Sequence, residues 1–124
     1  MKQVRHNAAL SELLGQTLTK VQCTEGEDEA KFTTSSRETF ILYHAQDCCE
    51  SVLIEDVCGD PSDLIGSPII MADESSSEKE AGYAHETWTF YRMATVDGTV
   101  VIRWLGESNG YYSEEVDLKV EAPE

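Results

Sequence analysis

Alternating polar and apolar residues run through much of this chain and predict β-strands over most of its length. Residues 17–23 alternate with a period of two, and residues 38–43 are rich in the aromatic and β-branched residues that strands favour. A shorter strand is expected at residues 31–34. Residues 8–14 instead show the spacing of a short amphipathic helix, between a capping asparagine and a terminating glycine.

The C-terminal third gives the clearest pattern. Residues 87–96, 99–106 and 111–120 alternate in the manner of strands, and Asp97-Gly98 and Asn109-Gly110 separate them. Both dipeptides favour the tight turns of hairpins, so we predict a three-stranded antiparallel meander. The large apolar residues expected in the core on its first two strands are Trp88, Phe90, Val100, Ile102 and Trp104.

The middle of the chain is less regular. Residues 47–58 fit both a helical face and a strand, and their β-branched content favours the strand. A helical turn is expected near Pro61, a mobile acidic and serine-rich loop at 73–82, and a flexible terminus at 1–6. The pattern as a whole predicts one mainly β, antiparallel domain over residues 1–124, with about seven strands and a short N-terminal helix.

Acidic residues outnumber basic ones 24 to 9, which gives a net charge of −15. Such a protein is repelled by phosphate backbones and anionic membranes, so we expect neither nucleic acid nor membrane as a direct partner. The charge serves solubility, or it attracts a partner with a basic surface, including a DNA-binding protein that a DNA mimic would block. No signal-type segment follows the N-terminal charges, so we expect a cytoplasmic protein with reduced thiols.

Candidate chemistry concentrates between His44 and Cys58. Zinc ligation would use His44, Cys48, Cys49 and Cys58, with His85 as a spare ligand. No Cys-x-x-Cys pair is present and the spacing matches no standard finger, so we expect no cofactor by default and keep zinc as the alternative. The competing interpretation is structural: the cysteines pack as small hydrophobic residues and His44 lies at the edge of the core.

The same segment could support catalysis. Cys48 or Cys49 could act as a nucleophile with His44 as base and Asp47 or Glu50 to orient it. Acidic surroundings raise the pKa of a thiol, which opposes this chemistry. Carboxylate pairs for hydrolysis could also be drawn, but 24 acids produce close pairs by chance. A metal-binding or hydrolytic site at His44, Asp47, Cys48, Cys49 and Cys58 therefore remains the alternative function.

A second segment, residues 103–114, has the composition of a recognition surface. It combines a hairpin tip with aromatic side chains that carry one polar end, a combination that is enriched at interfaces. The competing interpretation is that the asparagine and glycine make the turn while the tyrosines pack across the sheet. The candidate binding residues are Trp104, Glu107, Asn109, Tyr111 and Tyr112.

Taken together, these motifs resemble a family of small uncharacterised phage and bacterial proteins that is defined as a domain of unknown function. The likeness lies in residues 44–50, 55–60, 64–69, 87–91 and 103–114. The resemblance implies a phage or prophage origin and an intracellular site of action, and it transfers no catalytic or binding residue.

The function favoured by the sequence is a small acidic intracellular binding protein without enzymatic activity. With the resemblance, it becomes a phage or prophage accessory factor that engages a host or phage protein with a basic surface, as a DNA mimic or inhibitor. A self-associating structural component that uses exposed strand edges is a further alternative.

Overall fold

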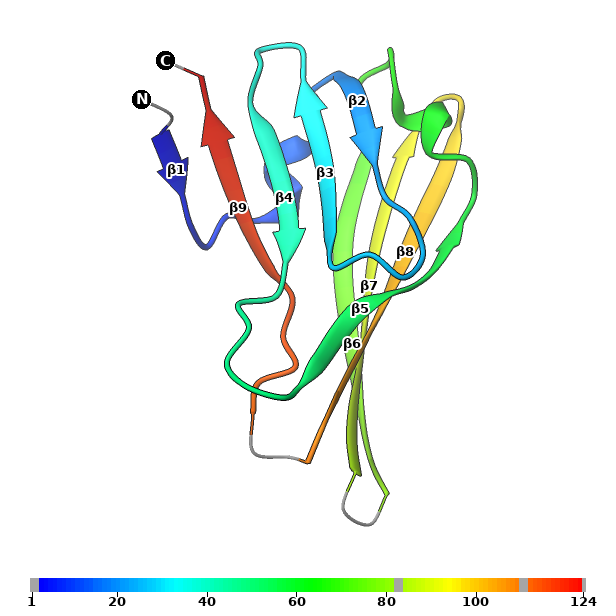
Figure 1. The fold of residues 1–124 in the computed structure, drawn as a ribbon. Coiled ribbons are helices and arrows are strands. Elements are labelled where there is room, and N and C mark those ends of the chain that lie inside the picture. Colours follow the sequence, from blue (N-terminus) through cyan, green and yellow to red (C-terminus); the bar gives the residue numbers. More distant parts are fainter. Residues whose placement is uncertain (1–2, 82–83, 110–111, 124) are drawn as a thin grey trace.

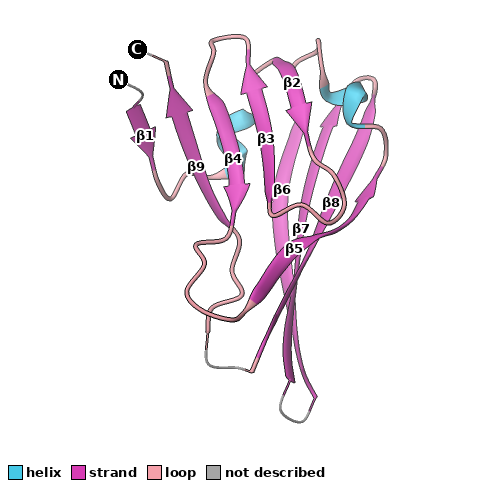
Figure 2. Ribbon diagram, viewed as in Figure 1, coloured by secondary structure: helices cyan, strands magenta, loops and turns pink. Residues whose placement is uncertain are grey.

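Two antiparallel sheets pack face to face (Figure 1; Figure 2). The computed structural model describes residues 3–81, 84–109 and 112–123. The first sheet has the order β1 (Gln3–Arg5), β9 (Asp117–Ala122), β4 (Thr39–Tyr43), β3 (Glu29–Thr34), β2 (Leu18–Gln22). The second has the order β5 (Ser51–Cys58), β8 (Gly98–Ser108), β7 (Ala84–Thr95), β6 (Met71–Ala81). Two 3₁₀ turns complete the described structure, η1 (Leu10–Leu13) and η2 (Pro61–Leu64).

The hydrophobic core lies between the sheets and is built from alternate residues of their strands. Phe32 and Phe40 enter it from the first sheet, and Met93, Ile102 and Trp104 enter it from the second, each at most 1% exposed. The prediction of a mainly β fold is confirmed. The described part of the chain has nine strands rather than about seven.

The N-terminal helix is shorter than predicted. Only Leu10–Leu13 turn, as a 3₁₀ helix that buries Leu10 and Leu13. An isolated helix of two turns is marginal, so tertiary packing of these two leucines decides how much of it forms. The expected turn near Pro61 is confirmed: the Asp60 carboxylate accepts a hydrogen bond from the Ser62 amide at 3.0 Å.

Two expectations about unstructured segments are wrong. The segment predicted as the 73–82 loop lies almost entirely in β6, which pairs with β7 from Met71 to Ala81. Polar residues suit this edge strand because its partner supplies the ladder of backbone hydrogen bonds and its side chains stay in water. Gln3–Arg5 of the expected flexible terminus pairs with β9, whereas residues 1–2 lie outside the described part of the chain.

The prediction of a three-stranded C-terminal meander is only partly correct. β7 and β8 form the predicted hairpin, with Thr95 opposite Gly98. The third strand, β9, joins the other sheet instead, where it pairs with β4. β8 pairs with β7 on one side and with β5 on the other. Leu118 and Val120 of β9 then bury their side chains against the same core from the opposite side.

The prediction of which β7 face enters the core is also wrong. Tyr91 and Met93 point inward and are at most 2% exposed, whereas Trp88 and Phe90 are only half-buried on the outer face. On β8, the prediction that Val100, Ile102 and Trp104 are buried is confirmed.

The second sheet is longer than the first, and this difference creates the candidate site. β6, β7 and β8 have 11, 12 and 11 residues, whereas β2, β3, β4 and β9 have five or six. At about 3.3 Å per residue the long strands extend roughly 15–20 Å further, so their ends lie beyond the covering sheet (Figure 1). There the inward side chains of β7 change from Tyr91 and Met93 to Thr87 and Thr89.

Candidate functional site

An open cleft of about 540 Å³ occupies the inner face of the overhanging β6–β7 hairpin. The segment of residues 112–116, which leads into β9, forms its other wall. The described residues that line it include four carboxylates but no lysine or arginine: they are Glu74, Ser75, Ser76, Glu78, His85, Thr87, Thr89, Tyr91, Tyr112, Ser113, Glu114, Glu115 and Val116. We call this feature the acidic cleft.

A buried carboxylate, Glu114, anchors the wall of the cleft. It accepts hydrogen bonds from His85 Nδ1 at 2.7 Å, from Thr87 Oγ1 at 2.8 Å and from the Ser108 hydroxyl. Burial alone would raise the pKa of Glu114, but these three donors outweigh it and lower the pKa. The Glu114 bond in turn raises the pKa of His85, which favours its protonated form.

A glycine makes this approach of the chain possible. A Cβ atom at Gly106 would lie 2.8 Å from the carbonyl oxygen of Glu114 and 2.7 Å from the Cβ atom of Glu114. Any side chain at this position would therefore push the 112–116 segment away from β8.

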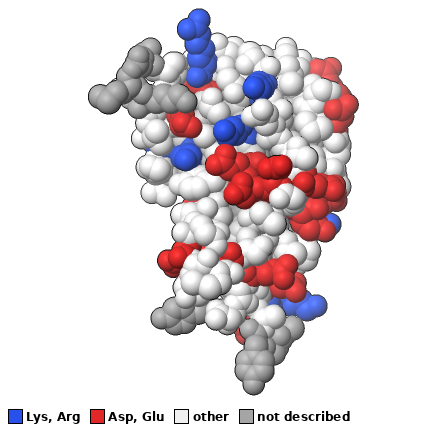
Figure 3. All heavy atoms as spheres, in the orientation of Figure 1, with Lys and Arg blue, Asp and Glu red and all other residues white. Residues whose placement is uncertain are grey.

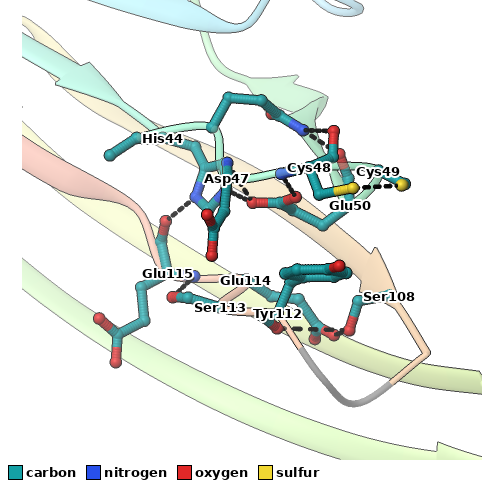
Figure 4. A network of polar contacts seen from close by, with 12 residues as sticks. His44, Asp47, Cys48, Cys49, Glu50, Ser108, Tyr112, Ser113, Glu114 and Glu115 are labelled. Atoms are coloured by element: carbon teal, nitrogen blue, oxygen red, sulfur yellow. Dashed lines mark hydrogen bonds and ion pairs between the residues drawn. The ribbon is translucent and has the colours of Figure 1, made fainter.

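A second buried pair, His44 and Glu50, lies beside the cleft (Figure 4). His44 Nε2 is 2.7 Å from Glu50 Oε2, and the two side chains are 4% and 0% exposed. Glu50 also accepts the amide protons of Asp47 and Cys48 at 2.9 and 2.8 Å. The hydrogen bond from His44 is the main reason that the pKa of Glu50 falls to about 2, with the two amides adding to it against the opposing effect of burial.

His44 connects the 44–50 loop to the residue that directly follows the 103–114 segment. Its Nδ1 is 2.7 Å from the carbonyl oxygen of Glu115, which can only accept. Its Nε2 faces the Glu50 carboxylate, so both ring nitrogens are engaged by oxygen atoms. The 44–50 loop is thereby fastened to the 112–116 wall of the cleft.

The predicted metal ligands do not converge. The described residues contain no group of three or more histidine, cysteine or carboxylate side chains placed to hold a metal ion. Cys58 ends β5, whereas Cys48 and Cys49 precede its start, about 23 Å away along an extended strand. The packing hypothesis is also wrong for these three cysteines, which are exposed; only Cys23 packs partly buried against the core.

The base predicted for the cysteine nucleophile, His44, is already engaged on both ring nitrogens. The partners of the ring are Glu50 and the Glu115 carbonyl oxygen. The pKa of Cys49 is raised, chiefly by its hydrogen bond to Cys48, and that of Cys58 by its hydrogen bond to Asp56. Both shifts reduce the thiolate that nucleophilic attack requires.

The predicted binding residues separate into buried, exposed and undescribed positions. The prediction that Trp104 is a surface binding residue is wrong, because this residue is 0% exposed and lies in the core. Tyr112 lies on the rim of the acidic cleft, and with Glu107 and Asn109 it also lines a smaller adjoining hollow. Tyr111 lies outside the described residues.

Sequence reasoning did not find the cleft itself. Glu74 and Glu78 lie in the segment predicted as a loop, and Glu114 ends the 103–114 segment without being one of its predicted binding residues. The available signal was the pair Thr87 and Thr89, which places polar residues at inward positions of a strand whose other end is apolar.

Acid should weaken the His44–Glu50 anchor in a defined window. The pKa of Glu50 is lowered from 4.5 to about 2, so its contribution to stability is complete above pH 4.5 and is lost as the pH falls toward 2. The Glu50→Gln variant has no carboxylate at this position to protonate. Its free energy of unfolding should therefore fall less between pH 4.5 and pH 2 than that of wild type. Urea unfolding at pH 7, 4.5, 3 and 2 measures this, with Glu107→Gln as the exposed control. Parallel pH profiles for wild type and Glu50→Gln would contradict the assignment.

These observations define a two-sheet antiparallel β domain with an acidic cleft at one end. The chain belongs to the family DUF7448, a domain of unknown function that matches residues 11–118. No curated protein and no solved structure gives a significant match to the chain. None of the described helices has the length and apolar character needed to cross a bilayer.

Proposed function

We propose that this chain is a small non-enzymatic binding protein whose acidic cleft receives a basic side chain of a partner protein. The observation that carries the proposal is the lining of the cleft, where Glu74, Glu78, Glu114 and Glu115 border a common space and no other described lining residue is a lysine or arginine. A lysine or arginine side chain that enters it gains several carboxylate partners at once.

The preorganised network supports recognition rather than simple solubility. Glu114 is held by three donors, and the cleft wall is fixed to the 44–50 loop through His44. A site whose polar groups are already oriented loses less conformational freedom on binding than a mobile one.

Long-range electrostatics support the same partner class. The net charge is −15, and acidic side chains gather in the middle and lower part of the face in Figure 3, with most of its basic side chains above them. Such a field attracts a basic protein and repels phosphate backbones and anionic lipids.

The wider role follows from the kinship suggested by the sequence. We propose a phage or prophage accessory factor that acts in the host cytoplasm, where it engages a host or phage protein as an inhibitor or DNA mimic. Self-association through strand edges has less support, because the β6 edge carries Asp73, Glu78, Lys79 and Glu80, and charged edges oppose pairing.

Affinity capture from bacterial host lysate tests this function. We expect a basic protein to be retained at low salt and released as the salt concentration rises, because exposed charges are screened. The captured protein is then purified and its Kd measured across the same salt series. Retention of no protein above a bead control, or of one whose Kd is independent of salt, would contradict the proposal.

A further inference from the structure

We propose that Cys48 and Cys49 form a redox modification site, a pair of neighbouring thiols that closes reversibly into a vicinal disulfide. The chain bends at these two residues, both side chains are exposed, and their Sγ atoms lie 2.6 Å apart (Figure 4). A disulfide bond requires about 2.05 Å, so the sulfurs need to approach by only about 0.6 Å.

The other cysteines lack this arrangement. Cys58 Sγ donates to the Asp56 carboxylate at 3.3 Å, and Cys23 packs against the core. Within the described structure, Cys48 and Cys49 are therefore the one pair of thiols in mutual contact.

The chemistry requires an oxidant, and a low-molecular-weight disulfide such as oxidised glutathione supplies it. One protein thiolate attacks the oxidant, breaks its S–S bond and releases a glutathione thiolate, which takes up a proton. The second cysteine then attacks the mixed disulfide, so that the Cys48–Cys49 bond forms and the second glutathione leaves. The two protein thiols lose two electrons and two protons, and oxidised glutathione becomes two molecules of glutathione.

The ring strain of a vicinal disulfide makes this site responsive rather than permanently oxidised. Strained and exposed disulfides have more oxidising potentials than structural ones, so reducing cytosol keeps the pair as thiols. Only a shift of the thiol pool toward oxidation closes the ring.

Closure would act on the rim of the acidic cleft. The Cys48 amide donates to Glu50 Oε1 at 2.8 Å, and its carbonyl oxygen accepts from the Gln46 side chain at 3.2 Å. A hydrogen bond with Cys48 raises the pKa of Tyr112, which places this rim residue against the pair. Distorting the 48–49 peptide disturbs these contacts. An effect on partner binding depends on the proposed function, whereas disulfide formation does not.

Mass spectrometry after treatment with oxidised glutathione tests the site. The folded protein is incubated at pH 8.5 until Cys58 carries glutathione, remaining thiols are alkylated, and the tryptic peptide 38–79 is sequenced. We expect Cys48 and Cys49 to have lost two hydrogens, with neither glutathione nor alkyl group attached. In Cys48→Ser and Cys49→Ser, the remaining thiol of the pair should retain glutathione.

Three outcomes would overturn the proposal. In the first, wild type retains glutathione on Cys48 or Cys49. In the second, Cys48 and Cys49 are both alkylated although Cys58 carries glutathione. In the third, Cys48 or Cys49 forms a disulfide with Cys58. The assay contains no partner, so its failure leaves the proposed binding function standing, and failure of partner capture leaves this site standing.

Discussion

Exchanging Glu74 and Glu78 for lysine is expected to weaken partner binding by at least about 100-fold. Both carboxylates line the acidic cleft from the exposed edge strand β6, so replacing them affects the site more than the fold. Placing two ammonium groups where a basic side chain must enter costs several kcal/mol, and every 1.4 kcal/mol corresponds to a factor of about ten in Kd. Isothermal titration with the captured partner measures the change.

A matched variant separates the cleft from the overall charge. Glu27→Lys with Asp28→Lys changes two exposed carboxylates in the β2–β3 turn, beside β5 at the opposite edge of the second sheet. Each pair of substitutions adds four charges and moves the net charge from −15 to −11. We expect the turn variant to lose no more than about threefold in affinity. Equal losses in both variants would show that net charge, rather than the cleft, determines binding.

Trp104→Ala is expected to cause the largest loss of stability among single core substitutions, about 3–5 kcal/mol in the free energy of unfolding. The indole is 0% exposed between the sheets, and its removal leaves a cavity that the surrounding strands can only partly fill. Chemical denaturation measures the loss, provided that the m-value of the variant equals that of wild type.

Two further substitutions check the physical reason. Trp88→Ala removes the same side chain from the outer face of β7, where the ring is half-buried under Arg103, and should cost less than about 2 kcal/mol. Trp104→Phe keeps a ring in the core and removes an indole Nε1 that has no hydrogen-bond partner in the described structure. It should therefore cost less than half as much as Trp104→Ala. Equal losses for Trp88→Ala and Trp104→Ala would contradict the assignment of the core face.

The sequence predicts best those elements whose signals are local. Val100, Ile102 and Trp104 alternate with outward residues after an Asp-Gly turn, and all three are buried in the hairpin that was expected. The Asp60 cap before Pro61 is equally local. Such features depend on neighbouring residues, so the pattern alone identifies them.

Pairing between distant strands is not encoded in this local pattern. β9 alternates as predicted, but nothing within Asp117–Ala122 specifies that it pairs with β4 rather than β8. β6 has little apolar content because an edge strand needs only a backbone partner, so its sequence resembles a loop. The orientation of β7 was misjudged because its largest side chains, Trp88 and Phe90, lie on the face away from the core.

The candidate site was predicted in part. The sequence indicated residues 44–50 and 103–114 as two independent segments, and the structure connects them through the bond between His44 and Glu115, the residue that follows the second segment. The sequence could not indicate that Glu114 pairs with Thr87, because this hydrogen bond links residues 27 positions apart. The sequence pattern also could not predict that Cys48 and Cys49 are exposed, because a short loop can turn its cysteines inward or outward.

Nuclear magnetic resonance mapping of the captured partner on the isotopically labelled protein tests the acidic cleft most directly. We predict that the amide shifts of His85, Thr87, Thr89 and Ser113 change together and saturate at the Kd from titration. Saturating shifts confined to the β2–β3 turn or the outer face of the first sheet, with these four amides unmoved, would contradict the account.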